Sequence, residues 1–397
     1  MNKNTQSQFA KHFIYNQHIN KVVVPAAVAI LLTFGRNEML PFVNVYTFLD
    51  RSMNIFVLAA AFVVLPITFP RMLYLIVRSY PGVPILILWV SVIVLFSDYW
   101  PPRTTVITIS ISIALCLHIS RMELQRLRLF VLLLSCIFSL YTLTYANDSL
   151  VVILSGSLQQ QLGEFEPSNL IIFPRIINML ILTCVATVII EERKWLKLLA
   201  VLAMIVPLLI SLAIGNRGTM LALVVAIFAF VFGLSKNRHR LVATLIFCIV
   251  LIFSYYLVVT LLPVTEQRIL LSGVDASSIE RLLAWEQAMD INNISMFGQG
   301  VSDNYPHNIF LEFYLCYGIV GLILFLFVLA TSVITGWKCY QKTHDKEVLW
   351  VLCLLVLQVV AQQFSLNIFY GTFWCAIVLP LGIGLNRVFD YPQLVKT

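Results

Sequence analysis

The sequence predicts an all-α fold, a polytopic membrane helix bundle of about 12 transmembrane spans. Two observations carry this prediction. Of the 397 residues, 60% are hydrophobic and 11% are charged, with a mean hydropathy of +0.91, which lies far outside the range of soluble domains. Apolar runs long enough to cross a bilayer also recur along the chain. We therefore expect one transmembrane domain over residues 1–397, whose first span is retained because no cleavage site follows it.

A hydrocarbon core of about 30 Å needs about 20 apolar residues per helical span. This criterion predicts spans near residues 22–34, 53–69, 81–97, 104–119, 129–146, 170–190, 195–214, 218–234, 241–263, 308–336, 347–366 and 372–388. Two of the connecting segments, 147–169 and 264–306, are long enough to fold, and both are expected on the outer side of the membrane.

Basic residues are sorted between the two sides of the predicted bundle. With both termini in the cytoplasm, all lysines fall on the cytoplasmic side, as the positive-inside rule predicts. The basic residues on the other side are all arginines: Arg36, Arg51, Arg103, Arg175, Arg217, Arg268 and Arg281. A guanidinium can bind phosphate through two parallel hydrogen bonds, which an ammonium group cannot do. This sorting indicates that the outer arginines bind a phosphate ligand or lipid headgroups. It also accounts for the net charge of +7 without a nucleic-acid partner.

The longer outer segment contains a predicted amphipathic helix over residues 278–290. Ser277 and Glu280 have the spacing of a capping box, in which the serine caps the helix. Arg281 and Trp285 then share one face with Ala288. The opposite, apolar face suits a helix that lies on the membrane, and its members are Ile279, Leu282 and Leu283.

The junction between this segment and the next span holds the leading catalytic candidate. Pro306 is predicted in the first helical turn, where proline is tolerated. His307 is predicted in the same turn, where the positive end of the helix dipole keeps an imidazole neutral near pH 7 and therefore able to act as a general base. The alternative is structural: His307 and Asn308 satisfy free amide groups at the helix start.

Two outer arginines are predicted at membrane depth. Arg217 lies in the short hairpin Gly215-Asn216-Arg217-Gly218, and Arg175 follows Pro174 at the start of a span. An ionisable side chain at this depth is a functional candidate by default, with contact to a lipid headgroup as the alternative. Arg281 is either solvated on its helix or placed to bind an anionic headgroup.

Other motifs give no sign of a metal, a cofactor or a nucleotide. The chain has no phosphate-binding loop, no nucleophile elbow, no HExxH and no outer-face DxD. The cysteines lie mainly in apolar runs, with Cys339 predicted on a basic loop, and they indicate small core residues, not zinc ligands or disulfides.

Three short motifs resemble those of one membrane-enzyme family, the O-antigen ligase/polymerase superfamily of bacterial envelope glycosyltransferases. They are His307-Asn308 followed nine residues later by Gly318-x-x-Gly321, the span entry Gly215-x-Arg217-Gly218, and Arg281-x-x-x-Trp285 followed by Phe297-Gly-x-Gly300. The motifs cover roughly residues 200–335, and the rest of the chain resembles the family by span count only.

This resemblance implies a metal-independent glycosyltransferase of the GT-C-like kind, with its site on the periplasmic face of the inner membrane. Its substrate would be an undecaprenyl-pyrophosphate-linked oligosaccharide, and its other partners would be membrane lipid and a chain-length regulator protein. Arg217 and Arg281 would hold the pyrophosphate with Arg175, and His307 would activate the acceptor hydroxyl. The supporting residues would be Asn308, Glu280, Trp285 and Tyr305.

The resemblance leaves the branch of the superfamily open. The short segment 264–306 favours a Wzy-type O-antigen polymerase over a WaaL-type ligase, which tends to have a larger folded loop there. Glu280, Glu164 and Glu166 are alternative bases only if burial raises their pKa towards neutral pH. A lipid-linked glycan transporter or flippase is the alternative from another class, although the sequence shows no repeated halves.

Overall fold

The computed structural model of the chain describes residues 21–30, 74, 76–97, 103–117, 119, 123–145, 169–214, 216–235, 276–290, 295–300, 306–364 and 371–394. Within these ranges the chain forms α-helices and turns and contains no strand. The all-α prediction is therefore confirmed. The predicted spans near 53–69 and 241–263 lie outside the described residues, as do Glu164, Glu166 and Tyr305.

A described helix lies in every other predicted window. The helices are Lys21–Ile30, α3 (Gly82–Leu95), α4 (Arg103–Leu117), α5 (Leu124–Tyr145), α8 (Asn169–Ile190), α9 (Lys194–Ile214), α10 (Arg217–Leu234), α13 (Ala276–Met289), α14 (Ile309–Thr343), α15 (Lys346–Ala361) and α16 (Gly371–Leu394).

Two helices, Lys194–Leu212 and Ile309–Thr343, are long and apolar enough to cross a membrane by length and composition, and several shorter apolar helices accompany them. Large apolar side chains such as Leu88, Phe96 and Leu140 are exposed on the helices and turns around the core. In water such a surface would drive association, whereas lipid solvates it. The chain is a helical membrane bundle.

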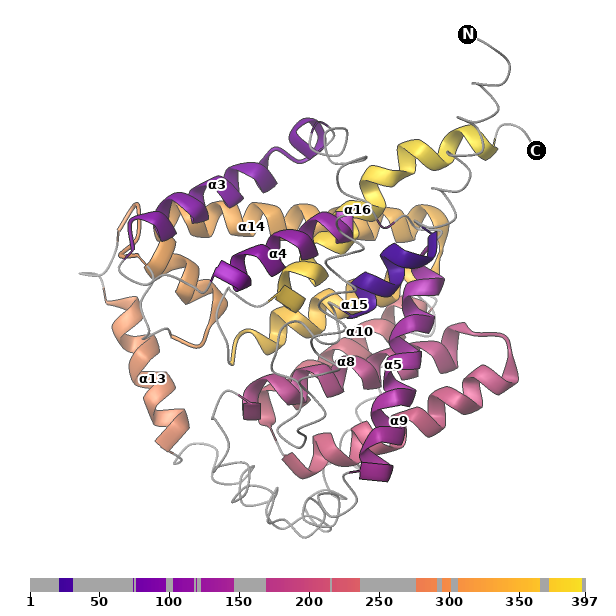
Figure 1. The fold of residues 1–397 in the computed structure, drawn as a ribbon. Coiled ribbons are helices and arrows are strands. Elements are labelled where there is room, and N and C mark those ends of the chain that lie inside the picture. The colour runs from indigo at the N-terminus through magenta and orange to yellow at the C-terminus, as the bar shows by residue number, and fades with distance from the viewer. Residues whose placement is uncertain are drawn as a thin grey trace.

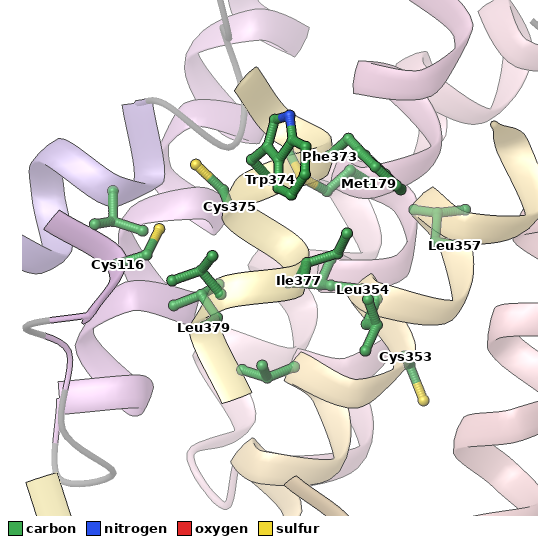
Figure 2. Close-up of a cluster of buried hydrophobic side chains, with 14 of the residues drawn as sticks. Cys116, Met179, Cys353, Leu354, Leu357, Phe373, Trp374, Cys375, Ile377 and Leu379 are labelled. Atoms are coloured by element: carbon green, nitrogen blue, oxygen red, sulfur yellow. The ribbon is translucent and has the colours of Figure 1, made fainter. Parts of the chain in front are cut away.

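Helix α15 is the centre of the bundle and contacts α8, α10, α14 and α16 (Figure 1). All its residues from 347 to 355 are buried, as expected of a helix that is apolar on every side. Figure 2 shows Leu354 and Leu357 of α15 packed near Phe373 and Ile377 of α16 and Met179 of α8. This core fixes the position of the two ends of α15, which carry the polar groups described below.

The described cysteines are free, and all are buried except Cys136, which is partly buried. They are core residues, as predicted. The prediction for Cys339 was wrong in its setting: it lies within α14 and is buried, because this helix continues to Thr343 instead of ending near residue 336.

Successive helices alternate between two ends of the bundle. We call one the Glu191 end, where α8 meets α9 at residues 191–193 and α14 meets α15 at residues 344–345. We call the other the His307 end, where α10 and α14 begin and α15 finishes. The described lysines all lie at the Glu191 end, and Arg175, Arg217 and Arg281 lie on helix segments of the His307 end.

Helix α14 is interrupted within its apolar length, so the span predicted over 308–336 is not one continuous helix. Gly318 has a left-handed backbone (φ 72°, ψ −176°) that breaks the helix. The rings of Phe313 and Phe325 stack with centroids 4.2 Å apart, whereas a straight helix would separate these residues by about 18 Å. Residues 309–317 therefore fold back along 319–343.

The loop 295–300 closes this break. Gln299 and Gly300 donate main-chain hydrogen bonds to Leu315 and Cys316, and the amide groups after the break, of Ile319 and Val320, donate back to the loop. A methyl group at either Gly298 (φ 81°) or Gly318 would collide with main-chain atoms of the other segment. The two glycine motifs are therefore structural parts of one junction, not separate features.

Candidate functional site

His307 lies immediately before the helix 309–317, not in its first turn as predicted. Asn308 is the N-cap, and its Oδ1 accepts hydrogen bonds from the amides of Phe310 and Leu311 at 3.0 and 3.2 Å. His307 has a left-handed backbone with φ 52°, which is uncommon outside glycine and often marks a functional position. Asn308 thus performs the capping role that the structural alternative gave to the pair.

The fold-back places His307 inside the bundle. Phe310, three residues later, lies 6.0 Å from Phe325 between ring centroids. Phe325 is about two helical turns, or about 10 Å, below the break at Gly318. Irregular backbone at such a depth is tolerated in a membrane protein where protein surrounds it or where it lines a polar cavity.

Helix α13 contacts the same turn through a tryptophan. Trp285 Nε1 donates to the carbonyl of Pro306 at 2.7 Å. Pro306 precedes the helix and is not in its first turn as predicted, because the helix begins at Ile309. Ala288 on this face is buried, and Arg281 and Trp285 are half-buried. The opposite face, with Ile279, Leu282 and Leu283, is exposed, so the predicted division of the two faces is correct.

The start of α13 differs from the prediction. The described helix begins at Ala276, so Ser277 lies within its first turn and not at the position before the helix where the prediction placed it. The glutamate side chain of Glu280 is among those that the structure does not describe.

The C-terminal turn of α15 brings Arg175 and the His307 turn together. Arg175, on the second turn of α8, is 2% exposed, and its Nη2 donates to the carbonyl of Ala361 at 2.7 Å. The next carbonyl, of Gln362, accepts from the amide of Ile309 at 3.2 Å. Two adjacent carbonyls at one helix end thus bind an arginine from one helix and the start of another.

Helix α10 begins beside the same turn. Asn216 caps it by accepting from the amide of Thr219 at 3.2 Å, and Asn178 of α8 donates to the carbonyl of Thr219 at 2.7 Å. A methyl group at Gly218 would meet the side chain of Phe364, three residues after α15. The backbone of Arg217, the first residue of α10, is thereby fixed near α8 and the end of α15.

Sequence reasoning missed three buried polar residues at this end. Glu312 is 2% exposed, one turn after Asn308, and Gln358 and Gln362 are buried in the last turns of α15. Each lies in an apolar run that is typical of a membrane span. The signal that could have found them is the same as for Arg175: each is a polar side chain at a depth in the membrane where burying a polar group costs free energy. No group of three or more potential metal ligands occurs among the described residues.

The fold and the site define a helical membrane protein with arginines, a histidine and buried amides gathered at one end of the bundle. Within this architecture, residues 199–326 match the family described as O-antigen ligase. The match includes Arg217, Arg281 and His307, and it confirms the resemblance to the O-antigen ligase/polymerase superfamily. It supports a ligase- or polymerase-type function on lipid-linked glycans in lipopolysaccharide biosynthesis. A search among curated proteins gave no match.

Proposed function

We propose that the chain is a glycosyltransferase that polymerises undecaprenyl-pyrophosphate-linked O-antigen repeat units on the periplasmic face of the inner membrane. The observation that carries the proposal is the shared C-terminal turn of α15, which brings Arg175 and the His307 turn into one site beside the start of α10. An arginine cluster suits a pyrophosphate, and a histidine suits proton transfer near neutral pH.

In the proposed reaction, a hydroxyl group of the acceptor sugar attacks the anomeric carbon of the donor sugar. The new C–O bond forms as the bond between that carbon and the pyrophosphate oxygen breaks, and the lipid pyrophosphate leaves with the electron pair. His307 takes the hydroxyl proton. Arg217, Arg281 and Arg175 stabilise the charge that develops on the leaving group, and electrostatic stabilisation of this kind often contributes more to catalysis than any other effect. This mechanism assigns no step to a metal or cofactor.

The orientation follows from charge. The Glu191 end carries the described lysines, and cytoplasmic loops are enriched in lysine and arginine. We therefore place the Glu191 end in the cytoplasm, with both termini, and the His307 end in the periplasm. A chain-length regulator protein is the proposed partner of the polymerase.

Transfer of the finished polymer to lipid A-core is the second candidate, because the family that matches residues 199–326 is described as O-antigen ligase. The lipopolysaccharide ladder of a deletion strain separates the two. Loss of a polymerase should leave core with a single repeat unit attached. Loss of a ligase should leave bare core, with polymer retained on the carrier lipid, and that result would overturn the polymerase assignment.

A further inference from the structure

Two glutamines occupy one face of the α15 C-terminus. Gln358 and Gln362 are one helical turn apart, so their side chains lie on the same side of the helix. Their exposed fractions are 3% and 0%. Both residues lie outside the segment that matches the O-antigen ligase family, which ends at residue 326.

Three of the four side-chain polar atoms of this pair are buried without a hydrogen-bond partner among the described residues. Oε1 of Gln358 and both Oε1 and Nε2 of Gln362 are shielded from solvent, and none has a hydrogen-bond partner there. Nearly all buried polar groups in folded proteins are hydrogen-bonded, and an apolar side chain of the same size would be more favourable for folding. Retaining two amides at such a position therefore points to a role other than stability.

The surroundings of the pair are those of the proposed site. The residue between them in the last turn, Ala361, accepts the hydrogen bond of Arg175, and the carbonyl of Gln362 holds the helix that follows His307. The neighbouring Gln363 behaves differently. Its Nε2 donates to the carbonyl of Val359 at 2.9 Å, so its amide is engaged by its own helix.

We propose that Gln358 and Gln362 form a polar subsite for the hydroxyl groups of the sugar that is linked to the pyrophosphate. This inference rests on the proposed function and adds to it the recognition of the glycan. A primary amide presents a carbonyl acceptor and two N–H donors, which match the donor and acceptor capacity of neighbouring sugar hydroxyls. Because the amides are uncharged, they are assigned to the sugar, whereas the arginines are assigned to the pyrophosphate.

The test compares Gln358→Met and Gln362→Met with the matched control Gln363→Met. Methionine keeps the length of the side chain but removes its strong hydrogen-bonding groups. The purified variants are assayed for transfer from the lipid-linked repeat unit that accumulates in a deletion strain, for binding of undecaprenyl pyrophosphate without a glycan, and for Tm. We expect KM for the lipid-linked repeat to rise about tenfold in each subsite variant, the size of one lost hydrogen bond.

Binding of the bare lipid pyrophosphate should stay at the wild-type value in the subsite variants, and Tm should be equal or higher. Gln363→Met should leave KM unchanged. If the methionine variants do not fold, Gln358→Asn and Gln362→Asn keep the amide but withdraw it by one methylene, and KM should still rise.

Two results would overturn the inference alone. One is wild-type KM in every folded subsite variant, and the other is an equal loss of binding for the bare lipid pyrophosphate, which would assign the pair to the phosphates. A wild-type protein that neither binds nor transfers the lipid-linked repeat would overturn the proposed function and the inference together.

Discussion

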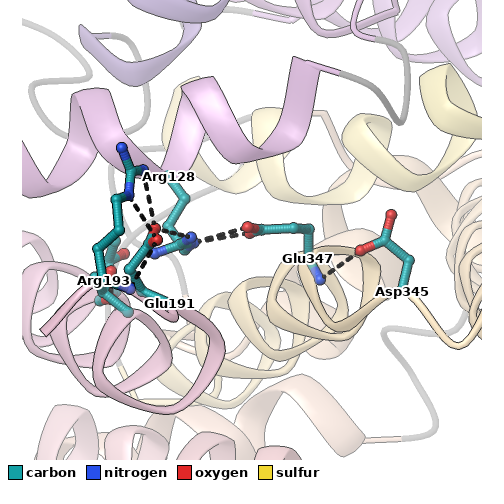
Figure 3. Close-up of polar contacts among 7 residues, drawn as sticks. Arg128, Glu191, Arg193, Asp345 and Glu347 are labelled. Carbon is teal, nitrogen blue, oxygen red and sulfur yellow. Dashed lines mark hydrogen bonds and ion pairs between the residues drawn. The ribbon is translucent and has the colours of Figure 1, made fainter. Parts of the chain in front are cut away.

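The two ends of α15 hold buried polar groups in different ways. At the Glu191 end, the Nε of Arg128 donates to both carboxylate oxygens of Glu347 at 3.0 and 2.8 Å, and its Nη2 donates to Glu191 at 3.4 Å (Figure 3). Asp345 caps α15 by accepting from the amide of Glu347 at 3.0 Å. At the His307 end, Arg175 donates to a main-chain carbonyl and two glutamines keep their amides without partners in the described part of the chain.

This difference fits a structural role for the polar groups of the Glu191 end and the proposed site at the His307 end. Arg128 is 0% exposed and comes from α5, while Glu191 directly follows α8 and Glu347 lies in α15. These opposite charges link three helices. Removing one of them would leave its partner as an unpaired buried charge, which destabilises the fold. The polar groups of the His307 end are instead arranged around helix termini and are suited to receive a ligand.

The largest expected effect is on His307. General-base catalysis contributes typically 10²- to 10⁴-fold, so His307→Ala should lower the rate of glycan transfer by about that factor while carrier-lipid binding is retained. Added divalent metal should not restore the rate. The measurement is elongation of lipid-linked repeats by the purified protein.

The control for this variant is His344→Ala at the Glu191 end. His344 caps the C-terminus of α14 and has nearly the same left-handed backbone (φ 51°) as His307. Both alanine variants therefore carry similar backbone strain, and a change specific to His307→Ala reports on the imidazole. Near wild-type elongation by His307→Ala would show that another group is the base, with Glu312 the buried candidate.

The matching change at the Glu191 end should act on stability. Arg128→Met leaves Glu347 buried without its partner, and breaking a buried ion pair costs about 3–5 kcal/mol. We expect a large fall in Tm, with an unchanged KM for the lipid-linked repeat in the protein that remains folded. Adding Glu347→Gln should recover part of the Tm. A raised KM at normal Tm would remove the distinction between the two ends.

A smaller effect is expected from exchanging one cation for another. Arg217→Lys should be nearly as inactive as Arg217→Ala, because the proposed grip on pyrophosphate uses two hydrogen bonds and not charge alone. Hydrogen bonds to a charged group correspond to about 10- to 100-fold in transfer rate. Arg281→Ala should have a weaker effect, since α13 lies at the periphery of the bundle (Figure 1).

The control is Arg126→Lys. Arg126 lies exposed at the Glu191 end and donates to the carbonyl of Lys21. This variant should keep wild-type transfer. Full activity of Arg217→Lys at normal expression would show that Arg217 contacts a lipid headgroup and does not bind the pyrophosphate.

The sequence predicted the helices well and the break in α14 not at all. Hydropathy follows the requirement of lipid for apolar surface, so the span positions could be read directly. The segments before and after Gly318 are both apolar, so hydropathy merges them, and the fold-back depends on contacts with a loop that lies some twenty residues earlier. The helical period gave the faces of α13 correctly because it depends on local geometry alone.

The site shows the same limit. His307 was predicted from its place at a helix start, and Arg217 and Arg175 from their depth; the short motifs then included His307 and Arg217 again. Their meeting at the end of α15 depends on three-dimensional packing that no local pattern contains. Gln362 was missed because a neutral amide at the end of an apolar run is common where a span meets water, and only its complete burial in the structure distinguishes it.

The smallest expected effect is on the pH dependence of stability. Hydrogen bonds from Arg193, with a further one from Arg128, lower the pKa of Glu191 from 4.5 to about 2. Because the folded-state pKa is the lower one, this stabilisation is complete above about pH 4.5 and is lost as the pH falls through about 2. The Tm of the wild type should therefore fall as the pH is lowered across this window. The Tm of Glu191→Gln should fall less steeply. Arg193 is 49% exposed, so salt should weaken its share of the effect. If Tm falls with pH equally in the wild type and in Glu191→Gln, the Glu191 carboxylate does not contribute to stability. Arg128 and Glu347 alone would then join the helices at the Glu191 end.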